Sequence, residues 1–220
     1  MKLIEINQNT IQEILKRHDK DGGNLINNSL TKLFNSLSDE TNEYEVSIKV
    51  AALNQIYSTA IQYIDPVVKK IVSEIDSSHA SYTFDQYVQK VDSISTVSWV
   101  NPSTKEKYTR CNLSFSSKYI HFLSNRKTPI YDSYIWIVMI GYLKQKNHAK
   151  YNFNPPESYA IFYEIFTLFK DLFGLGSYSN YDVDKFLWQY GKNMINEIIN
   201  TEDVGLNKAK SVLKSRIRIA

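Results

Sequence analysis

The sequence predicts an all-α protein of about nine helices, and three observations predict this class. Apolar residues recur three and four positions apart in most stretches of the chain, which is the period of an α-helix. Alternation of apolar and polar residues, which is typical of strands, is rare. In addition, 43% of the 220 residues are hydrophobic and 13% are aromatic, so the chain can bury a core in one domain or in two lobes.

The first hundred residues contain five apolar stretches of helical period, which predict helices over about 10–19, 25–34, 42–64, 66–75 and 83–91. Thr10 with Glu13, and Thr83 with Gln86, are capping-box patterns, in which each side chain satisfies a free backbone N–H at a helix start. Asp65-Pro66 ends the third helix and suits the start of the fourth.

The helical pattern is interrupted between residues 93 and 110. The β-branched run 93–99 is ambiguous and could be extended, but one such segment does not make a sheet. Residues 101–110 are polar and charged and contain a proline, so they predict an exposed loop. We therefore expect an N-terminal helical lobe over residues 1–100 and a C-terminal helical lobe, with the candidate site, over residues 101–220.

Apolar residues at helical spacing also occur in the second half, where they predict helices over about 114–124, 132–143, 162–173, 182–198 and 209–217. The third of these is a dense apolar stripe that the Gly174-Leu175-Gly176 turn ends. The last is basic on several faces.

Charge and cysteine content limit the classes of function. Residues 1–100 hold 9 Lys+Arg against 13 Asp+Glu, and residues 101–220 hold 17 against 10, so the halves carry −4 and +7. The basic half suits a nucleic-acid or acidic partner, or is merely a solvated surface. Cys111 is the only cysteine and forms no internal disulfide, and the histidines lack metal-site spacing. With no apolar run long enough to cross a bilayer, we expect a cytoplasmic protein without membrane contact, metal or cofactor.

Reactive side chains concentrate in residues 114–136. One side of the helix over 114–124 is apolar, and the other side holds Lys118 and His121. A desolvated Lys118 amine could act as a nucleophile while His121 moves its proton. The alternative is structural: Lys118 extends to solvent, and His121 donates a hydrogen bond to a carbonyl group.

Asp132 precedes the next apolar helix, so its expected structural role is that of an N-cap. The helix dipole keeps such a carboxylate ionised, and the anion could stabilise a cation that develops on a bound sugar. Arg126 and Lys127, just before it, either hold phosphates or are ordinary loop charges. Tyr131 and Tyr134 stand beside these basic residues, as stacking on an extruded base requires, although core packing is an alternative.

In its order of lysine, apolar turns, loop, proline and aspartate, this segment resembles the active site of the helix-hairpin-helix DNA glycosylases, the endonuclease III and 8-oxoguanine glycosylase superfamily. The likeness covers residues 114–136, with Leu113-Ser114-Phe115-Ser116-Ser117 in place of the family's glycine-containing hairpin. It implies a helical glycosylase fold. It also implies that Lys118 attacks the sugar carbon as a Schiff-base nucleophile and that Asp132 assists.

The second half also resembles a set of uncharacterised bacterial helical proteins. The matching motifs are SSKYIH, the loop Pro129-Ile130-Tyr131-Asp132-Ser133, and the helix that runs from Asp184 to Lys192. This resemblance implies no activity. It marks Trp188 and Lys192 as candidates to lie near Asp132, because Trp188 lies off the apolar stripe and Gly191 permits close approach of a neighbour. Ordinary packing is the alternative for Trp188.

Two functions follow from these residues. The first is a DNA glycosylase-like protein that excises a modified base, in repair or in defence against foreign DNA. Asp132 would stabilise the sugar cation, Lys118 would be nucleophile or phosphate clamp, and His121 and Tyr131 would orient base or water. Binding would involve Tyr131, Ser133, Arg126, Lys127, Trp188 and Lys192. The second is a non-catalytic helical module that binds DNA or an unspecified protein. Motifs for nucleotide hydrolysis, zinc proteolysis and serine hydrolysis are missing from the sequence.

Overall fold

A computed structural model describes residues 1–101, 103–146, 148 and 150–218. The all-α prediction is confirmed: the described residues form ten α-helices, one short 3₁₀ turn (η1, His79–Ser81) and a single two-stranded sheet. None of the described helices combines the length and the apolar character that crossing a bilayer requires.

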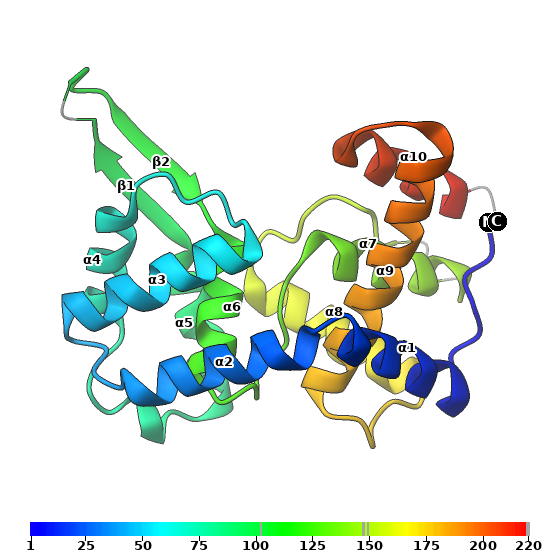
Figure 1. Ribbon diagram of the computed structural model, residues 1–220, viewed down its shortest axis with the longest axis horizontal. Coiled ribbons are helices and arrows are strands. Elements are labelled where there is room, and N and C mark those ends of the chain that lie inside the picture. The colour runs from blue at the N-terminus through cyan, green and yellow to red at the C-terminus, as the bar shows by residue number, and fades with distance from the viewer. Residues whose placement is uncertain (102, 147, 149, 219–220) are drawn as a thin grey trace. The chain divides into compact units, whose positions relative to one another are not determined.

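Contacts divide the chain into two compact units (Figure 1). Unit 1 contains residues 1–24, 132–156 and 164–220, and unit 2 contains residues 25–131 and 157–163. These units differ in extent from the lobes 1–100 and 101–220 expected from the sequence, because residues 101–131 pack with the helices that precede them. Helix α8 (Tyr159–Leu172) begins in unit 2 and continues in unit 1.

Unit 1 is built around its longest helix, α9 (Asn180–Glu202). This helix packs against α1 (Gln8–Lys20), α7 (Ser133–Gln145) and α10 (Leu206–Arg218). Helix α7 is buried on every side from Ile135 to Leu143, as expected for a helix that is apolar all round. A Cβ atom on Gly191 of α9 would lie 3.0 Å from the Tyr134 Cβ, so the glycine permits the close contact between α9 and α7.

Unit 2 contains α2 (Gly23–Ser36) from residue 25 onward, and four further whole helices. These are α3 (Glu43–Tyr57), α4 (Ile64–Glu74), α5 (Phe84–Ser95) and α6 (Leu113–Leu123). Helix α6 packs against α3 and α5, and α4 packs against α3 and α5. The capping box of Thr83 and Gln86 at the start of α5 is confirmed. The box expected from Thr10 and Glu13 is wrong, because α1 begins at Gln8 and Asn7 is its N-cap.

The helix expected over residues 42–64 is shorter than predicted. Helix α3 ends at Tyr57, because Ser58 and Ala60 adopt positive φ angles of 49° and 58°, which interrupt the helical backbone. Helix α4 then begins at Ile64 and carries Pro66 in its first turn, where the missing N–H of proline costs nothing. The apolar pattern continues past Tyr57 because Ile61, which lies in the turn between α3 and α4, is also buried.

Residues 107–110 are exposed, as expected, but they form a strand and not a loop. Strand β1 (Thr96–Val100) pairs antiparallel with β2 (Lys107–Cys111), and Trp99 lies opposite Tyr108. The two strands project from the helices of unit 2 as a ribbon (Figure 1). β-Branched and aromatic residues favour this pairing even where neighbouring side chains are charged.

A buried ion pair holds the core of unit 2. Lys49 of α3 and Glu40 have fully buried side chains that contact each other, and the Lys49 ammonium also donates to the Leu37 carbonyl oxygen at 3.0 Å. Tyr119 of α6 donates its hydroxyl to the other oxygen of Glu40. Burial and the Glu40 charge raise the pKa of Tyr119 well above its ordinary value, so the phenol stays protonated as the donor.

We expect Lys49→Met to lower the free energy of unfolding by about 3 to 5 kcal/mol, because it leaves the Glu40 carboxylate buried without its cation. Urea denaturation measures this loss. Lys69→Met removes an exposed lysine whose partner Asp65 is also exposed, so this control variant should unfold at nearly the wild-type urea concentration. Equal effects of the two substitutions would contradict the importance of the buried pair.

Candidate functional site

The residues singled out in the sequence belong to different units. Unit 2 contains five of them: Lys118, His121, Arg126, Lys127 and Tyr131. Unit 1 contains the other four: Asp132, Ser133, Trp188 and Lys192. The division falls between Tyr131 and Asp132. Each group is therefore described on its own.

Lys118 is held inside unit 2. It is only 3% exposed, so the alternative that Lys118 extends to solvent is wrong. The ammonium group donates to the Ser114 hydroxyl at 2.7 Å, one turn earlier on α6, and lies 5.4 Å from the centre of the Tyr57 ring. A neighbouring hydroxyl and an aromatic face therefore contribute to keeping a cation in this position.

His121 has the structural role that the sequence left open. The ring is fully buried, and Nδ1 lies 2.6 Å from the Thr128 carbonyl oxygen. Burial lowers the pKa of His121 to about 4, although the hydrogen bond to Thr128 opposes this shift. The imidazole is therefore neutral near pH 7, with Nδ1–H donating to the carbonyl group.

The loop after α6 is fixed by bonds to neighbouring elements of unit 2. The Ser117 hydroxyl accepts the Tyr131 backbone N–H at 3.0 Å, which ties the end of the loop to α6. Arg126 donates to the Thr31 hydroxyl at 2.6 Å and to the Asn27 carbonyl oxygen at 3.0 Å, both on α2. The guanidinium group of Arg126 thus anchors the loop to a helix.

Lys127 and Tyr131 differ in exposure. Lys127 lies exposed on the loop. Tyr131 is buried, and its ring meets the Phe162 ring edge to face at 5.4 Å. Packing, which the sequence left as an alternative for this tyrosine, is its observed role in unit 2.

In unit 1, Asp132 has the predicted structural role. It is the N-cap of α7 in an extended conformation, and its carboxylate accepts the Tyr134 backbone N–H at 2.9 Å. Asp132, Ser133 and Tyr134 are all half-buried. Trp136, one turn into α7, is buried and donates its indole N–H to the Asn154 carbonyl oxygen, so it belongs to the core.

Trp188 and Lys192 lie one turn apart on α9 and close to the start of α7. The Lys192 ammonium is 4.9 Å from the centre of the Trp188 ring, and that ring is 6.4 Å from the Tyr134 ring. Lys210 of α10 places its own ammonium 5.1 Å from the centre of the Tyr134 ring. We call these four half-buried residues, Tyr134, Trp188, Lys192 and Lys210, the ring-lysine cluster.

The sequence did not single out Lys210. The sequence shows only that Lys210 belongs to the basic C-terminal tail, and helical spacing does not show which lysine of that tail contacts another helix. Trp188 also contacts His18 of α1, whose ring lies 6.0 Å away at an angle of 80°. Burial lowers the pKa of His18, so this neighbour adds no charge near pH 7.

Among the residues that the structure describes, no three or more His, Cys, Asp or Glu side chains lie close enough together to hold a metal ion.

Comparison with known proteins identifies a family. A family model with the description HI_0787_N, N-terminal domain, matches residues 10–128, which is just over half of the chain. The chain belongs to this family. The matched residues contain Lys118, His121 and Arg126, and they end before Asp132 and the ring-lysine cluster. Searches of curated proteins and of solved structures gave no match.

The neutral His121 predicts a specific pH dependence of stability. Because the pKa is about 4 in the folded chain and 6.5 ordinarily, the unfolded chain binds more protons between these values. The contribution of His121 to the free energy of unfolding is complete above pH 6.5 and falls toward pH 4, by at most about 1.4 kcal/mol per pH unit. His121→Gln keeps an amide donor for Thr128 but does not titrate.

Chemical denaturation of both proteins across this pH range measures the difference, and the shared titration of His18 cancels in the comparison. We expect the wild type to lose more stability than His121→Gln as the pH falls. Parallel pH profiles would contradict a neutral, buried His121.

Proposed function

We propose that the chain binds DNA and that the ring-lysine cluster of unit 1 contacts the nucleic acid. The observation that carries this proposal is the pairing of two half-buried rings, Tyr134 and Trp188, with a lysine ammonium over each. Aromatic faces stack on bases, and lysines neutralise phosphates, so this combination suits a nucleic-acid strand. The three helices that supply the cluster pack on one another, which preorganises it.

The charge of α10 also supports the proposal. Its residues include five Lys or Arg and no Asp or Glu. Ala209, Leu213 and Ile217 are buried on one side of the helix, so Lys208 and Ser211 stay exposed on the other. A phosphate backbone would meet a helix that carries basic and no acidic side chains, next to the two rings.

Binding should weaken markedly in the double variant Lys192→Ala/Lys210→Ala. Each lysine that contacts a phosphate releases about one counterion, so the slope of log K against log salt should become shallower by about 2. Fluorescence anisotropy with a fluorescein-labelled duplex oligonucleotide, measured at several salt concentrations, tests this result.

Lys69→Ala/Lys107→Ala is the charge-matched control, because it also removes two lysines and both are exposed in unit 2. It should bind the duplex like the wild type. A wild type without affinity for the duplex, or a double variant with an unchanged salt slope, would exclude the cluster as the DNA contact.

Base excision is a second candidate function, favoured by the position of Asp132. This half-buried carboxylate caps α7 two residues before Tyr134, so it lies in the same unit and on the same helix start as the cluster. In hydrolysis of the N-glycosidic bond, the base leaves with the bonding electrons and takes up a proton, and water adds its hydroxyl to the sugar carbon. A fixed anion stabilises the cationic sugar between these steps. The resemblance of residues 114–136 to the glycosylases implies the same role for Asp132.

If the chain excises bases, Asp132→Asn should lower the excision rate by about 100-fold, because it removes the charge that stabilises the sugar cation. The amide of Asn caps a helix as well as the carboxylate of Asp does, so folding and DNA binding should persist. Gel assays with duplexes that each carry one damaged base, 8-oxoguanine or uracil among them, measure excision after alkaline cleavage.

Asp132→Ala separates the two roles of this residue, since it loses both charge and cap and should unfold about 1 kcal/mol more easily. Full excision by Asp132→Asn would rule out the electrostatic role. Borohydride trapping on abasic DNA tests the implied Lys118 nucleophile in the same assay, since Lys118→Met could form no Schiff base.

A further inference from the structure

Strand β1 has one paired edge and one edge that borders a groove. In the sheet, β1 pairs only with β2. A groove of about 740 Å³ lies between β1 and α4 in unit 2, within the size range of ligand-binding clefts. Residues 97–100 of β1 all line it, although neighbouring side chains in a strand point to opposite faces. The groove therefore follows the edge of the strand rather than one face of the sheet.

The hydrogen-bond register shows which backbone groups border this groove. At the two ends of the ribbon, Asn112 N–H donates to the Ser95 carbonyl oxygen and Asn101 N–H donates to the Glu106 carbonyl oxygen. Hydrogen-bonded pairs alternate along an antiparallel ribbon, so Val97 and Trp99 direct their backbone groups toward β2. Ser98 and Val100 direct their N–H and C=O groups the other way, toward the groove.

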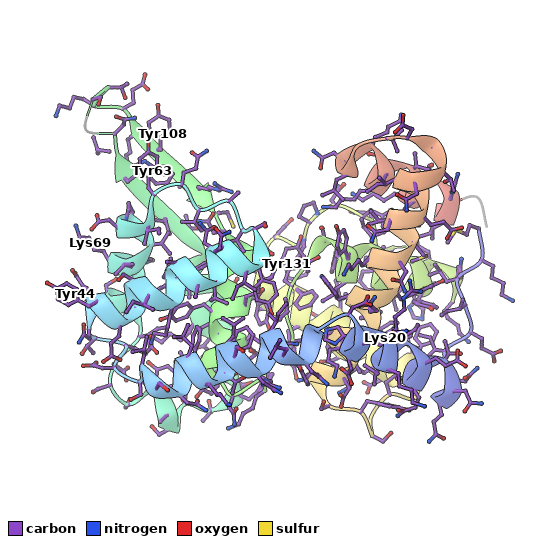
Figure 2. The ribbon with its side chains drawn as sticks, viewed as in Figure 1. Lys20, Tyr44, Tyr63, Lys69, Tyr108 and Tyr131 are labelled. Carbon is purple, nitrogen blue, oxygen red and sulfur yellow. The ribbon has the colours of Figure 1, made fainter. Side chains whose placement is uncertain are left out.

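The remaining walls of the groove are partly apolar and partly basic. Tyr63 is 46% exposed, and its ring lies 5.6 Å from the Trp99 ring. Val100 is 56% exposed at the end of β1. Lys69 and Lys70 line the groove from α4, where Lys69 pairs with Asp65 at 3.0 Å and Lys70 pairs with Glu74 at 2.7 Å. Figure 2 labels Tyr63 beside the ribbon and Lys69 on the neighbouring helix.

We propose that an extended segment of a partner protein, with apolar and acidic residues in alternation, adds to β1 as a third strand in this groove. Alternating donors and acceptors at strand spacing match the backbone of another strand and give affinity independent of sequence. Lys69 favours an acidic side chain, because it is 61% exposed and its partner Asp65 is exposed too, so this weak surface pair can be exchanged. Tyr63 and Val100 favour apolar side chains. The proposal is independent of DNA binding, which involves unit 1.

Other occupants fit the groove less well. A nucleic-acid strand offers no ladder of amide donors and carbonyl acceptors to the Ser98 and Val100 backbone. A second copy of the chain would bring its own α4 against the same edge, since α4 packs on β1, and two helices would then compete for one groove. A single extended peptide meets neither difficulty.

The test uses the full chain and the peptide acetyl-Val-Glu-Val-Glu-Val-Glu-amide with a fluorescent label. We expect binding by anisotropy, together with new protection of the Ser98 and Val100 amides from hydrogen exchange. Two N-methylated forms of the peptide, one methylated at every valine and one at every glutamate, place the methyl groups on opposite edges. One form should bind at least about fivefold to tenfold more weakly than the other, because only one edge of the peptide pairs with β1.

Val100→Pro and Val100→Ala are the matched protein variants. Proline removes the Val100 N–H that points toward the groove, and it spares the bonds to β2, as at other strand edges. Val100→Pro should lose peptide affinity, whereas Val100→Ala keeps the N–H and should retain most of it. The N-methylated peptides keep the test decisive on the wild type if the proline variant unfolds.

Several outcomes would overturn the proposal. These are no binding of the peptide at millimolar concentration, equal binding of the two N-methylated forms, displacement of the bound peptide by an oligothymidine strand, and self-association of the wild type that Val100→Pro abolishes. Loss of duplex DNA binding in the Lys192→Ala/Lys210→Ala variant, with peptide binding unchanged, would leave the groove assigned to a protein partner.

Discussion

Unit 2 depends on the burial of α6, which leaves most polar side chains of this helix without access to water. Lys118, Tyr119 and His121 are all buried along it. Burying such a group without a partner costs several kcal/mol, so each of these side chains needs a hydrogen-bond partner within the core. Tyr119 requires the Glu40 carboxylate, His121 requires the Thr128 carbonyl group, and Lys118 requires the Ser114 hydroxyl. The packing of unit 2 thus follows from hydrogen-bond needs as much as from apolar surface.

Helical period and caps were sufficient to predict most of the fold. The all-α class, the capping box of Thr83 and the N-cap role of Asp132 depend on residues close in sequence, and such local signals are strong. The ribbon was missed because each strand holds only five residues, and pairing between distant strands leaves little trace in one sequence. The Glu40–Lys49 pair was missed because a buried charge looks like a surface charge until its partner is known.

The candidate site was predicted only in part, because local sequence signals do not show which distant residues meet. Gly191 correctly indicated a close helix contact, and it brings Trp188 next to Tyr134. Lys210 joins them from a helix whose place no local pattern fixes. The opposite holds for Arg126, where a charge that looked suited to phosphates anchors the loop to α2. Side-chain type indicates what a residue can do, whereas the fold decides which of its neighbours are available.

The unpaired edge of β1 also affects the tendency of this protein to aggregate while it folds. An open strand edge is a template for wrong pairing between chains, and proteins commonly protect such edges with charge or with a covering element. Here the groove leaves the outer edge of β1 open, and the exposed Lys107 on the partner strand supplies a charge. Before α4 has docked, Val97 and Trp99 of β1 are exposed in addition to this edge, since β1 packs on α4 in the folded unit. Aggregation during expression or refolding should therefore begin at this ribbon rather than in the helical core.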